Sequence, residues 1–313
     1  MSDVLFIKTS SLGDVIHHMP ALTEAHEHRP DTRFSWLVEE PFAPLVRLHP
    51  AVDEVIPVAT RRWRRTPLAW PEAARFVLAL RGRCFDEIID TQGLVKSALF
   101  ARSARGRRHG YDGRSIKEPL ASRFYDVPHA VEWNAHAIAR NRVLTGLALG
   151  YVPQGTPDYG LDRARIAERA AAPYAVLLHA TARSEKQWPL DNWRSLAAAL
   201  AKTIDIILLW GTASERDGAA YIAAATTRAR VPERRPLDGV ARLIAGASFV
   251  VGVDTGLLHL AAALGVSLVA IFTGSDPTLT GPMGSGPMAI VGQRGEAPSL
   301  AKVTEAIATI EPR

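Results

Sequence analysis

Residues 249–264, with the sequence FVVGVDTGLLHLAAAL, decide the fold class of this chain. Five apolar residues end in Asp254-Thr255-Gly256, and a second apolar run follows directly. A short buried strand that passes through a tight turn into a helix is typical of an α/β protein. The free amide groups and the positive dipole end of such a helix bind anions. On its position alone, His259 fits a buried core histidine better than a ligand.

The same alternation of apolar strands and amphipathic helices extends along the chain. It predicts strands at residues 4–8, 34–38, 54–58, 87–90, 174–179, 204–210, 249–253 and 268–272. It predicts helices at residues 14–28, 73–80, 94–101, 191–202 (capped by Asp191), 215–229, 237–245, 257–264 and 300–310. Strands and helices in alternation form parallel sheets with crossover helices, and ligands bind beyond the carboxyl ends of the strands.

The length of 313 residues favours two domains. The strand–helix pattern is interrupted at residues 151–160, YVPQGTPDYG, where Pro and Gly are typical of a linker. We therefore predict an N-terminal domain at residues 1–155 and a second domain at residues 156–298. A final helix within residues 299–313 can pack back across the domains.

The composition is that of a globular protein, with 47% hydrophobic and 22% charged residues. Cys84 is the single cysteine, which excludes an intramolecular disulfide. No signal peptide opens the sequence, and no apolar stretch reaches the roughly 20 residues that a bilayer span needs. These features predict a soluble protein of the cytoplasm.

The net charge of +5 is unevenly distributed. Two basic clusters consist of Arg61, Arg62, Arg64 and Arg65 around Trp63, and of Arg102, Arg105, Arg107 and Arg108. Such patches bind anionic membranes, nucleic acid or acidic substrates, although a solvated basic face explains them equally well from charge alone. No helix-turn-helix, zinc-ligand spacing or RNA-binding aromatic motif is present, so we expect no nucleic-acid partner.

Three further loops at predicted strand ends carry polar side chains. Asp14 opens a helix, where it is either a catalytic group or a cap that satisfies free amides. Thr181 and Lys186 suit a diphosphate, although an ordinary polar loop is as good an explanation. Glu215 either accepts hydrogen bonds from sugar hydroxyls or caps its helix. The first loop lacks the Walker A and Gly-x-Gly-x-x-Gly patterns, so a nicotinamide cofactor is not indicated.

Taken together, the ordered motifs of the chain resemble those of the ADP-heptose:lipopolysaccharide heptosyltransferases of glycosyltransferase family 9, and among them the enzyme that adds the first heptose. The motifs are KTSSLGDV (8–15), RRWR (61–64), QGLVKSA (92–98), EPLAS (118–122), HAT (179–181), KQWP (186–189) and DTGLLH (254–259). The resemblance implies a GT-B architecture, in which two Rossmann-like α/β domains with parallel sheets face each other across a cleft. The N-terminal domain then binds the acceptor and the second domain the ADP-sugar.

The resemblance also implies an activity. This activity is the inverting, metal-independent transfer of L-glycero-D-manno-heptose from ADP-heptose to the inner Kdo of Kdo2-lipid A, in lipopolysaccharide core biosynthesis. ADP-heptose is a substrate, so no cofactor and no metal are expected. The expected place of action is the cytoplasmic face of the inner membrane, where the protein is peripheral.

Residue roles follow from the same resemblance. Asp14 matches the general base, and Lys186 matches a ligand of the donor phosphates that also serves catalysis. The implied donor-binding residues are Ser10, Thr181, Lys186, Glu215, Asp254, Thr255, Gly256 and His259. The implied acceptor-binding residues are Arg61, Arg62, Arg64 and Lys117. Two positions depart from the family pattern: Ala182 replaces a second threonine, and Lys117 stands where relatives can carry arginine.

The chemistry agrees with these roles. A carboxylate can take the proton of the attacking hydroxyl, which contributes roughly 10²–10⁴-fold to the rate. Cationic and amide groups can stabilise the charge that grows on a departing diphosphate. No Asp-x-Asp motif is present to hold a metal. Two alternatives remain: a related GT-B glycosyltransferase with a different acceptor, and a non-catalytic nucleotide- or nucleic-acid-binding module.

Overall fold

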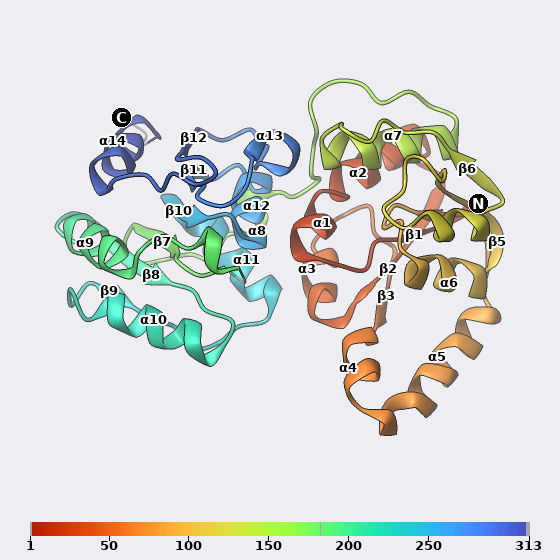
Figure 1. Cartoon of the computed structure of the whole chain (residues 1–313), viewed down its shortest axis with the longest axis horizontal. Coiled ribbons are helices and arrows are strands. Elements are labelled where there is room, and N and C mark those ends of the chain that lie inside the picture. Colours follow the sequence, from red (N-terminus) through yellow and green to blue (C-terminus); the bar gives the residue numbers. More distant parts are fainter. Residues whose placement is uncertain (1, 182, 311–313) are drawn as a thin grey trace. The chain divides into compact units, whose positions relative to one another are not determined.

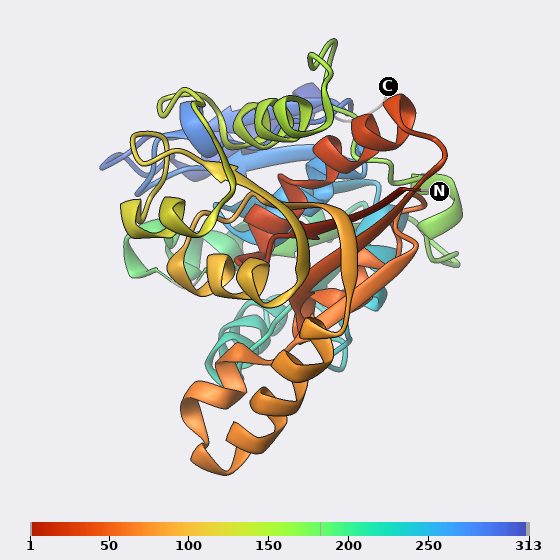
Figure 2. The same cartoon turned by 90° about the vertical axis from the view of Figure 1, so that its right-hand side faces the viewer.

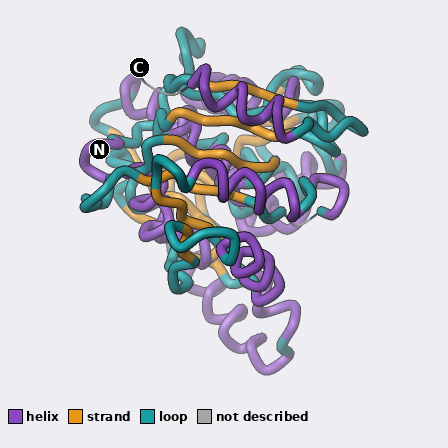
Figure 3. The backbone as a smooth tube through the Cα atoms, turned by 90° about the vertical axis from the view of Figure 1, so that its left-hand side faces the viewer, coloured by secondary structure: helices purple, strands orange, loops and turns teal. Residues whose placement is uncertain are grey.

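The computed structural model describes residues 2–181 and 183–310 of the chain. The chain divides into two compact units, Met1–Gly160 and Leu161–Arg313, and each unit is built around its own parallel sheet (Figure 1). The division falls at the end of the Pro- and Gly-rich segment 151–160. Figure 3 shows the strands running side by side between layers of helices, as the strand–helix alternation predicts.

The first unit contains a six-stranded parallel sheet in the order β3-β2-β1-β4-β5-β6. Its strands are β1 (Ser2–Ile7), β2 (Thr32–Glu39), β3 (Glu54–Val58), β4 (Cys84–Asp90), β5 (Arg105–Tyr111) and β6 (Val127–His129). This is the strand order of the Rossmann fold, in which the chain reverses direction across the sheet between β1 and β4. Ligands of such sheets bind beyond the carboxyl ends of the two strands at that reversal.

The helices of the first unit cover both faces of the sheet (Figure 2). They are α1 (Leu12–Ile16), α2 (Met19–His28), α3 (Ala43–Val46), α4 (Thr60–Arg65), α5 (Trp70–Arg81), α6 (Val95–Ser103) and α7 (Ala137–Leu149), with short 3₁₀ turns η1 (Glu40–Phe42), η2 (Pro67–Ala69) and η3 (Pro119–Phe124). On one face, Leu5 and Ile7 of β1 pack in a buried cluster with Trp63, Leu80 and Phe100 from α4, α5 and α6. The helices α2 and α7 pack against each other over the opposite face (Figure 1).

The helix predicted at residues 14–28 is wrong as a single element. The structure has two helices, α1 and α2, which are separated at His17 and His18. Pro20 lies in the first turn of α2, where its missing amide does no harm. Its ring would clash in the interior of a continuous helix, so the chain starts a new helix there.

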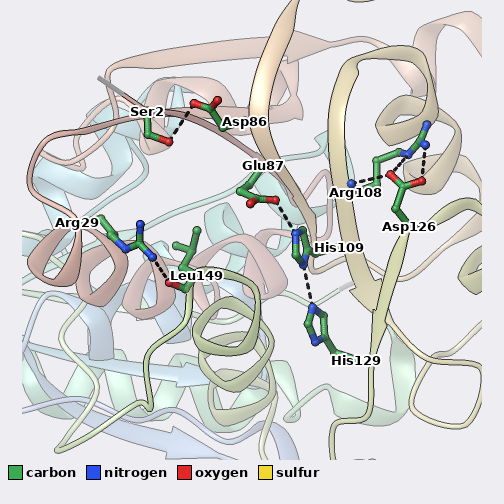
Figure 4. A network of polar contacts seen from close by, with 9 residues as sticks. All are labelled: Ser2, Arg29, Asp86, Glu87, Arg108, His109, Asp126, His129 and Leu149. Atoms are coloured by element: carbon green, nitrogen blue, oxygen red, sulfur yellow. Dashed lines mark hydrogen bonds and ion pairs between the residues drawn. The ribbon is translucent and has the colours of Figure 1, made fainter.

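A chain of polar contacts joins the last three strands of the first sheet (Figure 4). His109 of β5 lies 2.6 Å, Nε2 to Oε2, from Glu87 of β4, and its Nδ1 lies 2.9 Å from Nε2 of His129 on β6. Burial lowers the pKa of His109, which favours the neutral ring. A neutral ring that donates to Glu87 must accept the hydrogen bond from His129. Arg108, on the same strand, makes a two-pronged ion pair with Asp126.

The second unit repeats the same topology, in the order β12-β11-β10-β7-β8-β9. Its strands are β7 (Tyr174–Leu178), β8 (Asp205–Leu208), β9 (Ala229–Arg230), β10 (Phe249–Val253), β11 (Ser267–Ile271) and β12 (Met288–Val291). Read from β7, this is again the Rossmann order, and the reversal lies between β7 and β10. Residues 249–264 therefore contain β10, one of the two strands at whose carboxyl ends a ligand is expected.

The helices of the second unit also lie on both faces of its sheet. They are α8 (Arg163–Ile166), α9 (Leu190–Leu200), α10 (Ala213–Ala223), α11 (Leu237–Gly246), α12 (Gly256–Ala263), α13 (Pro277–Thr280) and α14 (Leu300–Ile310), with the 3₁₀ turn η4 (Ser184–Lys186). Pro189, and not the predicted Asp191, is the N-cap of α9. Asp191 lies inside the first turn and accepts a hydrogen bond of 2.6 Å from Tyr221 on α10.

The C-terminal helix α14 belongs to the core of the second unit. Val303, Ile307 and Ile310 are buried in the same cluster as Trp193 of α9 and Val269 of β11. The helix contacts β11, β12 and α9. It therefore packs within the second unit, and packing across the domains stays a prediction. Within the described residues, no helix is both long and apolar enough to cross a bilayer.

Candidate active site

One candidate site is a cavity of about 160 Å³ in the first unit. It opens at the carboxyl ends of β1 and β4, where the strand order predicts a ligand. Its lining includes Lys8, Asp14, Gln92, Lys117, Arg140 and Asn141. The structure therefore brings one carboxylate and three cationic side chains to a single pocket.

Asp14 both caps a helix and lines this cavity. Its Oδ2 atom accepts hydrogen bonds from the backbone amide of Ser11 at 2.7 Å and from the Ser11 hydroxyl at 2.9 Å. Gln92, which follows β4, fixes the loop that carries Asp14. Its side-chain oxygen accepts hydrogen bonds from the amides of Thr9 and Ser10, each at 3.0 Å. Asp14 is thus held in place by its own turn while its carboxylate borders the pocket.

Lys8 and Arg140 form the cationic wall of the cavity. The buried Lys8 ammonium donates to the Thr91 carbonyl at 2.7 Å and lies 3.4 Å from Oδ1 of Asn141. Burial lowers the pKa of Lys8, and the charge of Asp14 opposes this shift. The Arg140 guanidinium lies between the rings of Tyr111 and Trp133, at 4.9 and 4.7 Å from their centroids. Aromatic faces on two sides fix the guanidinium by cation–π attraction.

The acceptor residues predicted from the sequence do not all meet at this pocket. Lys117 lines the cavity with Asp14. The arginines lie on α4, which follows β3, and they are not among the residues that line the cavity. Arg62 pairs with Glu40 at 2.9 Å and with Glu72 at 2.5 Å. Arg61 lies over the ring of Phe42, 5.3 Å from its centroid.

A second candidate site lies in the second unit and surrounds Asp254, which directly follows β10. The Lys186 ammonium lies 2.5 Å from Oδ2 of Asp254, and the Ser275 hydroxyl donates to the same oxygen. Oδ1 faces Nε2 of His259 at 3.8 Å. The Thr181 hydroxyl, from the loop after β7, donates to the Asp254 carbonyl at 3.1 Å. Two loops distant in sequence are therefore joined through one buried aspartate.

The electrostatics of Asp254 favour its charged form. Burial by itself raises the pKa of the Asp254 carboxyl. The hydrogen bonds from His259, Lys186 and Ser275 act in the opposite direction and together outweigh burial, so the pKa lies well below its usual range. The ionised aspartate in turn fixes the position of the Lys186 ammonium. An ammonium group has three N–H donors, and Asp254 occupies only one of them.

The start of α12 supplies backbone donors beside this pair. Thr255 is the N-cap residue, in an extended conformation, and its side chain makes no capping bond. The helix begins at Gly256. The amide of Leu258 bonds to the Thr255 carbonyl at 3.0 Å, and among the described residues no side chain accepts from the amides of Gly256 and Leu257. Such amides, with the positive end of the helix dipole, form an anion site. This geometry agrees with the anion-binding turn that residues 254–256 predict.

A cavity of about 380 Å³ lies beside these loops in the second unit. It is lined by His179, Ala180, Thr181, Gln187, Trp188, Pro189, Leu190, Ser214, Glu215 and Gly218. Glu215 closes a capping box at the start of α10, since its Oε2 accepts from the amides of Gly211 and Thr212 at 2.6 and 3.1 Å. Its carboxylate therefore has a structural role as well as a place in the cavity wall.

Three residues of these two candidate sites were not predicted from the sequence. Arg140 lies on α7, in a part of the chain where no helix was predicted. Asn141 follows it on the same helix, and its side-chain amide donates to the His17 carbonyl at 3.0 Å. Ser275 lies beyond β11 and reaches Asp254 only through the fold. Ala182, one of the two departures from the family pattern, lies outside the described residues.

Comparison with known proteins identifies the family of this chain. Residues 73–308 match glycosyltransferase family 9 (heptosyltransferase). The chain belongs to this family. It is therefore an enzyme, a glycosyltransferase, as the motifs predicted.

Curated members of the family are similar over nearly the whole chain. Lipopolysaccharide heptosyltransferase 1 of Escherichia coli strain K12 is 44% identical over 293 residues, which cover 91% of this chain and 92% of that protein. The protein of the same name from Pseudomonas aeruginosa is 44% identical over 317 residues, which cover 99% of this chain and 89% of that protein.

Solved structures agree with the fold of this glycosyltransferase. E. coli heptosyltransferase WaaC with ADP superposes with a TM-score of 0.91 at 41% identity, over 98% of this chain and 99% of that chain. The E. coli ADP-heptose heptosyltransferase II superposes with a TM-score of 0.82 at 20% identity, over 99% of this chain and 98% of that chain, which is a likeness of fold. The predicted GT-B class, with two Rossmann-like domains, is confirmed.

Proposed function

We propose that this glycosyltransferase transfers L-glycero-D-manno-heptose from ADP-heptose to the inner Kdo of Kdo2-lipid A, with inversion and without a metal. The relatives that are 44% identical carry the name lipopolysaccharide heptosyltransferase 1. The structure of WaaC with ADP-2-deoxy-2-fluoro heptose superposes with a TM-score of 0.89 at 41% identity. These likenesses support heptose transfer in lipopolysaccharide core biosynthesis.

The second unit supports the donor side of the proposal. The diphosphate of ADP-heptose takes the place beside Lys186 and the first turn of α12, where an ammonium and free amides lie close together. Thr181 and Ser275 hold Asp254, and Asp254 holds Lys186. Lys186 thus meets the diphosphate already oriented. Fixed donors of this kind stabilise the charge that grows on departing ADP.

The metal-independent mechanism rests on the same groups. As the bond between the anomeric carbon and the ADP oxygen breaks, its electron pair goes to the diphosphate. The Lys186 cation and the helix amides supply positive potential at that point, which is the task of a divalent ion in metal-dependent enzymes. A protein cation fixed at the phosphates therefore stabilises the departing ADP in place of a metal ion.

Asp14 is the proposed general base. Both of its capping bonds go to Oδ2. Oδ1 makes no capping bond among the described residues, so it remains available to accept from an acceptor hydroxyl. In the proposed step, Oδ1 takes the hydroxyl proton while the acceptor oxygen attacks the anomeric carbon from the face opposite to ADP. One displacement of this kind inverts the configuration, and ADP leaves with the electron pair of the broken bond. General-base help contributes roughly 10²–10⁴-fold.

The observation that carries the acceptor proposal is the cavity that joins Asp14 to Lys8, Lys117 and Arg140. Kdo is a sugar acid, so its carboxylate needs a cationic partner near the hydroxyl that reacts. Arg140 presents a planar guanidinium fixed between two rings, a geometry that suits a carboxylate. The arginines of α4 are then available for more distant anionic groups of lipid A. A membrane-bound acceptor also requires the enzyme to work as a peripheral protein on the cytoplasmic face of the inner membrane.

The test is ADP release from ADP-heptose, measured with and without Kdo2-lipid A in the presence of EDTA. The proposal expects release that depends on the acceptor and continues after chelation. Release that stops with EDTA and returns with Mg²⁺ would overturn the metal-independent step. Release with another acceptor, and none with Kdo2-lipid A, would overturn the choice of acceptor.

A further inference from the structure

The segment between β3 and β4 forms a helical hairpin that stands out from the rest of the first unit (Figures 1 and 2). It consists of α4, η2 and α5, at residues 60–81, and we call it the α4–α5 hairpin. Its base is anchored in the core, since the Trp63 and Phe76 rings lie 5.4 Å apart and Phe76 lies 5.8 Å from Phe100. At the tip, η2, only Ala69 packs against the buried core cluster that contains Trp63 and Phe100.

The tip exposes large apolar side chains to solvent. The sequence Pro67-Leu68-Ala69-Trp70-Pro71 is apolar throughout. The side chain of Leu68 is 91% exposed and that of Trp70 is 66% exposed. Scattered exposed leucines are ordinary, but adjacent exposed apolar residues framed by polar ones mark a contact surface.

The charge around this tip is strongly positive. Residues 60–81 contain six arginines and one acidic residue, Glu72. Arg62 is engaged by Glu40 and Glu72. Within the described ranges, Arg64 and Arg65 make no ion pair, and both precede the apolar tip directly. An apolar tip with an arginine collar is complementary to an anionic bilayer, where tryptophan and leucine enter the interface and arginine binds phosphate.

The size of the tip favours a lipid surface over a protein partner. A stable protein interface buries roughly 800 Å² on each side, which five residues at the end of a hairpin cannot supply. A bilayer needs no such area, because each inserted side chain gains from leaving water and each arginine gains from the surface charge.

We propose that the α4–α5 hairpin is a membrane anchor, in which Leu68 and Trp70 insert into an anionic bilayer and the neighbouring arginines bind its phosphates. The inference rests on the proposed function in one respect, since a lipid acceptor brings the enzyme to that surface. It names the element of the chain that makes the contact and the two side chains that enter the membrane.

Vesicle binding tests the anchor directly. The intact protein is sedimented with vesicles of phosphatidylethanolamine and phosphatidylglycerol, as wild type and as the variant Leu68→Ser/Trp70→Ser. We expect the variant to need at least ten-fold more lipid for half-maximal binding. Vesicles of phosphatidylcholine alone should bind the wild type at least ten-fold more weakly. Val152→Ser is the matched control, because Val152 is an aliphatic residue 74% exposed in the same unit, and it should bind as the wild type does.

A second measurement separates insertion from simple attraction. Leu68→Cys in a Cys84→Ser background carries an environment-sensitive fluorophore, whose emission should rise and shift to the blue on phosphatidylglycerol vesicles. Thermal unfolding of each variant shows that the fold is retained. Unchanged vesicle binding by the double variant, or an unshifted fluorophore, would overturn the anchor. A wild-type dimer that the double substitution dissociates would instead assign the tip to a second copy of the chain, and would also overturn it.

The outcome is distinguishable from that of the proposed function. Turnover with a water-soluble, deacylated Kdo acceptor should be the same for the wild type and the Leu68→Ser/Trp70→Ser variant. A wild type that inserts into vesicles but transfers no heptose to this acceptor would leave the anchor standing and remove the proposed reaction. A wild type that transfers heptose without binding vesicles would leave the proposed reaction standing and remove the anchor.

Discussion

The ammonium of Lys186 lies 2.5 Å from Oδ2 of Asp254 and thereby joins the loops that follow β7 and β10. These two strands flank the reversal of the second sheet, so the ion pair lies where a Rossmann fold binds its ligand. The ion pair neutralises a buried carboxylate. In the proposed function it also fixes a cation for the donor diphosphate.

Substitutions at this pair should separate stability from activity. Lys186→Met leaves Asp254 buried without its main cation, so we expect a loss of about 3 kcal/mol in the free energy of unfolding. ADP affinity should fall by roughly 10–100-fold, as expected for a lost charged hydrogen bond. Denaturant unfolding and calorimetric titration with ADP measure the two effects.

The control is Lys186→Met/Asp254→Asn, which removes both charges. It should regain most of the lost stability, because no unpaired charge remains, while ADP affinity and turnover stay low. Recovery of turnover in the double variant would show that Lys186 does not serve the diphosphate.

Removal of the Asp14 carboxylate should affect the chemical step. Asp14→Asn keeps the size of the side chain and an oxygen that can cap the helix, but it cannot accept the acceptor proton at neutral pH. We expect turnover to fall roughly 10²–10⁴-fold, with ADP affinity within two-fold of the wild type. Single-turnover kinetics and ADP titration measure these quantities.

Ser11→Ala serves as the matched control for the cap. It removes the hydroxyl that donates to Asp14 but leaves the carboxylate in place. The expected cost is about 1 kcal/mol of stability with turnover within a few-fold of wild type. If Ser11→Ala lowered turnover as far as Asp14→Asn does, the carboxylate would be acting through the loop conformation and not as a base.

Arg140 should determine the affinity for an acceptor that carries a carboxylate. Loss of a charged hydrogen bond predicts that Arg140→Gln raises KM for the Kdo acceptor by roughly 10–100-fold, with a much smaller change in kcat. The wild type should prefer the free acid over its methyl ester, and the variant should lose that preference. Arg123→Gln, an exposed arginine of the same unit outside the cavity, is the control. Equal preference for acid over ester in wild type and Arg140→Gln would remove the assignment.

Stability should decrease as the pH falls below about 6.5. Burial is the main cause that lowers the pKa of His49, to about 4, so the folded state favours the neutral ring. Between these two values the unfolded chain binds a proton that the folded chain does not, and folding is weakened as pH falls. The full effect of this residue is about 3 kcal/mol, reached near pH 4.

His49→Gln should reduce this dependence. The Nδ1 atom of His49 accepts from the Ala51 amide at 3.2 Å, and Nε2 contacts the Thr23 hydroxyl at 3.0 Å. A glutamine can replace one of these bonds but does not titrate. Denaturant unfolding at pH 7 and pH 5 should show a smaller drop for the variant than for the wild type, and an identical drop would exclude His49 as the cause.

The parts of the fold with a strong apolar pattern were predictable. The strand β10 and the helix α14 have the predicted bounds, and α12 lies within one residue of its prediction at each end. The strand β5 was not predictable, because its sequence, RGRRHGY, consists mainly of arginine, histidine and glycine and lacks the apolar pattern of a strand. Inside the fold, Arg108 of this strand is neutralised by Asp126, a contact that the sequence does not reveal.

The geometry of the candidate sites was predictable where the residues lie in one continuous motif. Asp254, Thr255 and Gly256 form the predicted turn, and Lys186 lies beside it. Arg140 was missed because the helix α7 carries charged residues that are paired or stacked inside the unit, so its polar and apolar faces are not separated in the sequence. The mutual approach of the domains across a cleft, and the acceptor roles of the α4 arginines, stay predictions.

The central claim is tested most directly by the product of the reaction. The enzyme is incubated with ADP-heptose and a soluble Kdo acceptor in EDTA, and NMR spectroscopy follows the anomeric signals of donor and product. The account predicts one heptose attached to Kdo, with an anomeric configuration opposite to that of the donor. A product that retains the donor configuration, or heptose released only to water, would contradict it.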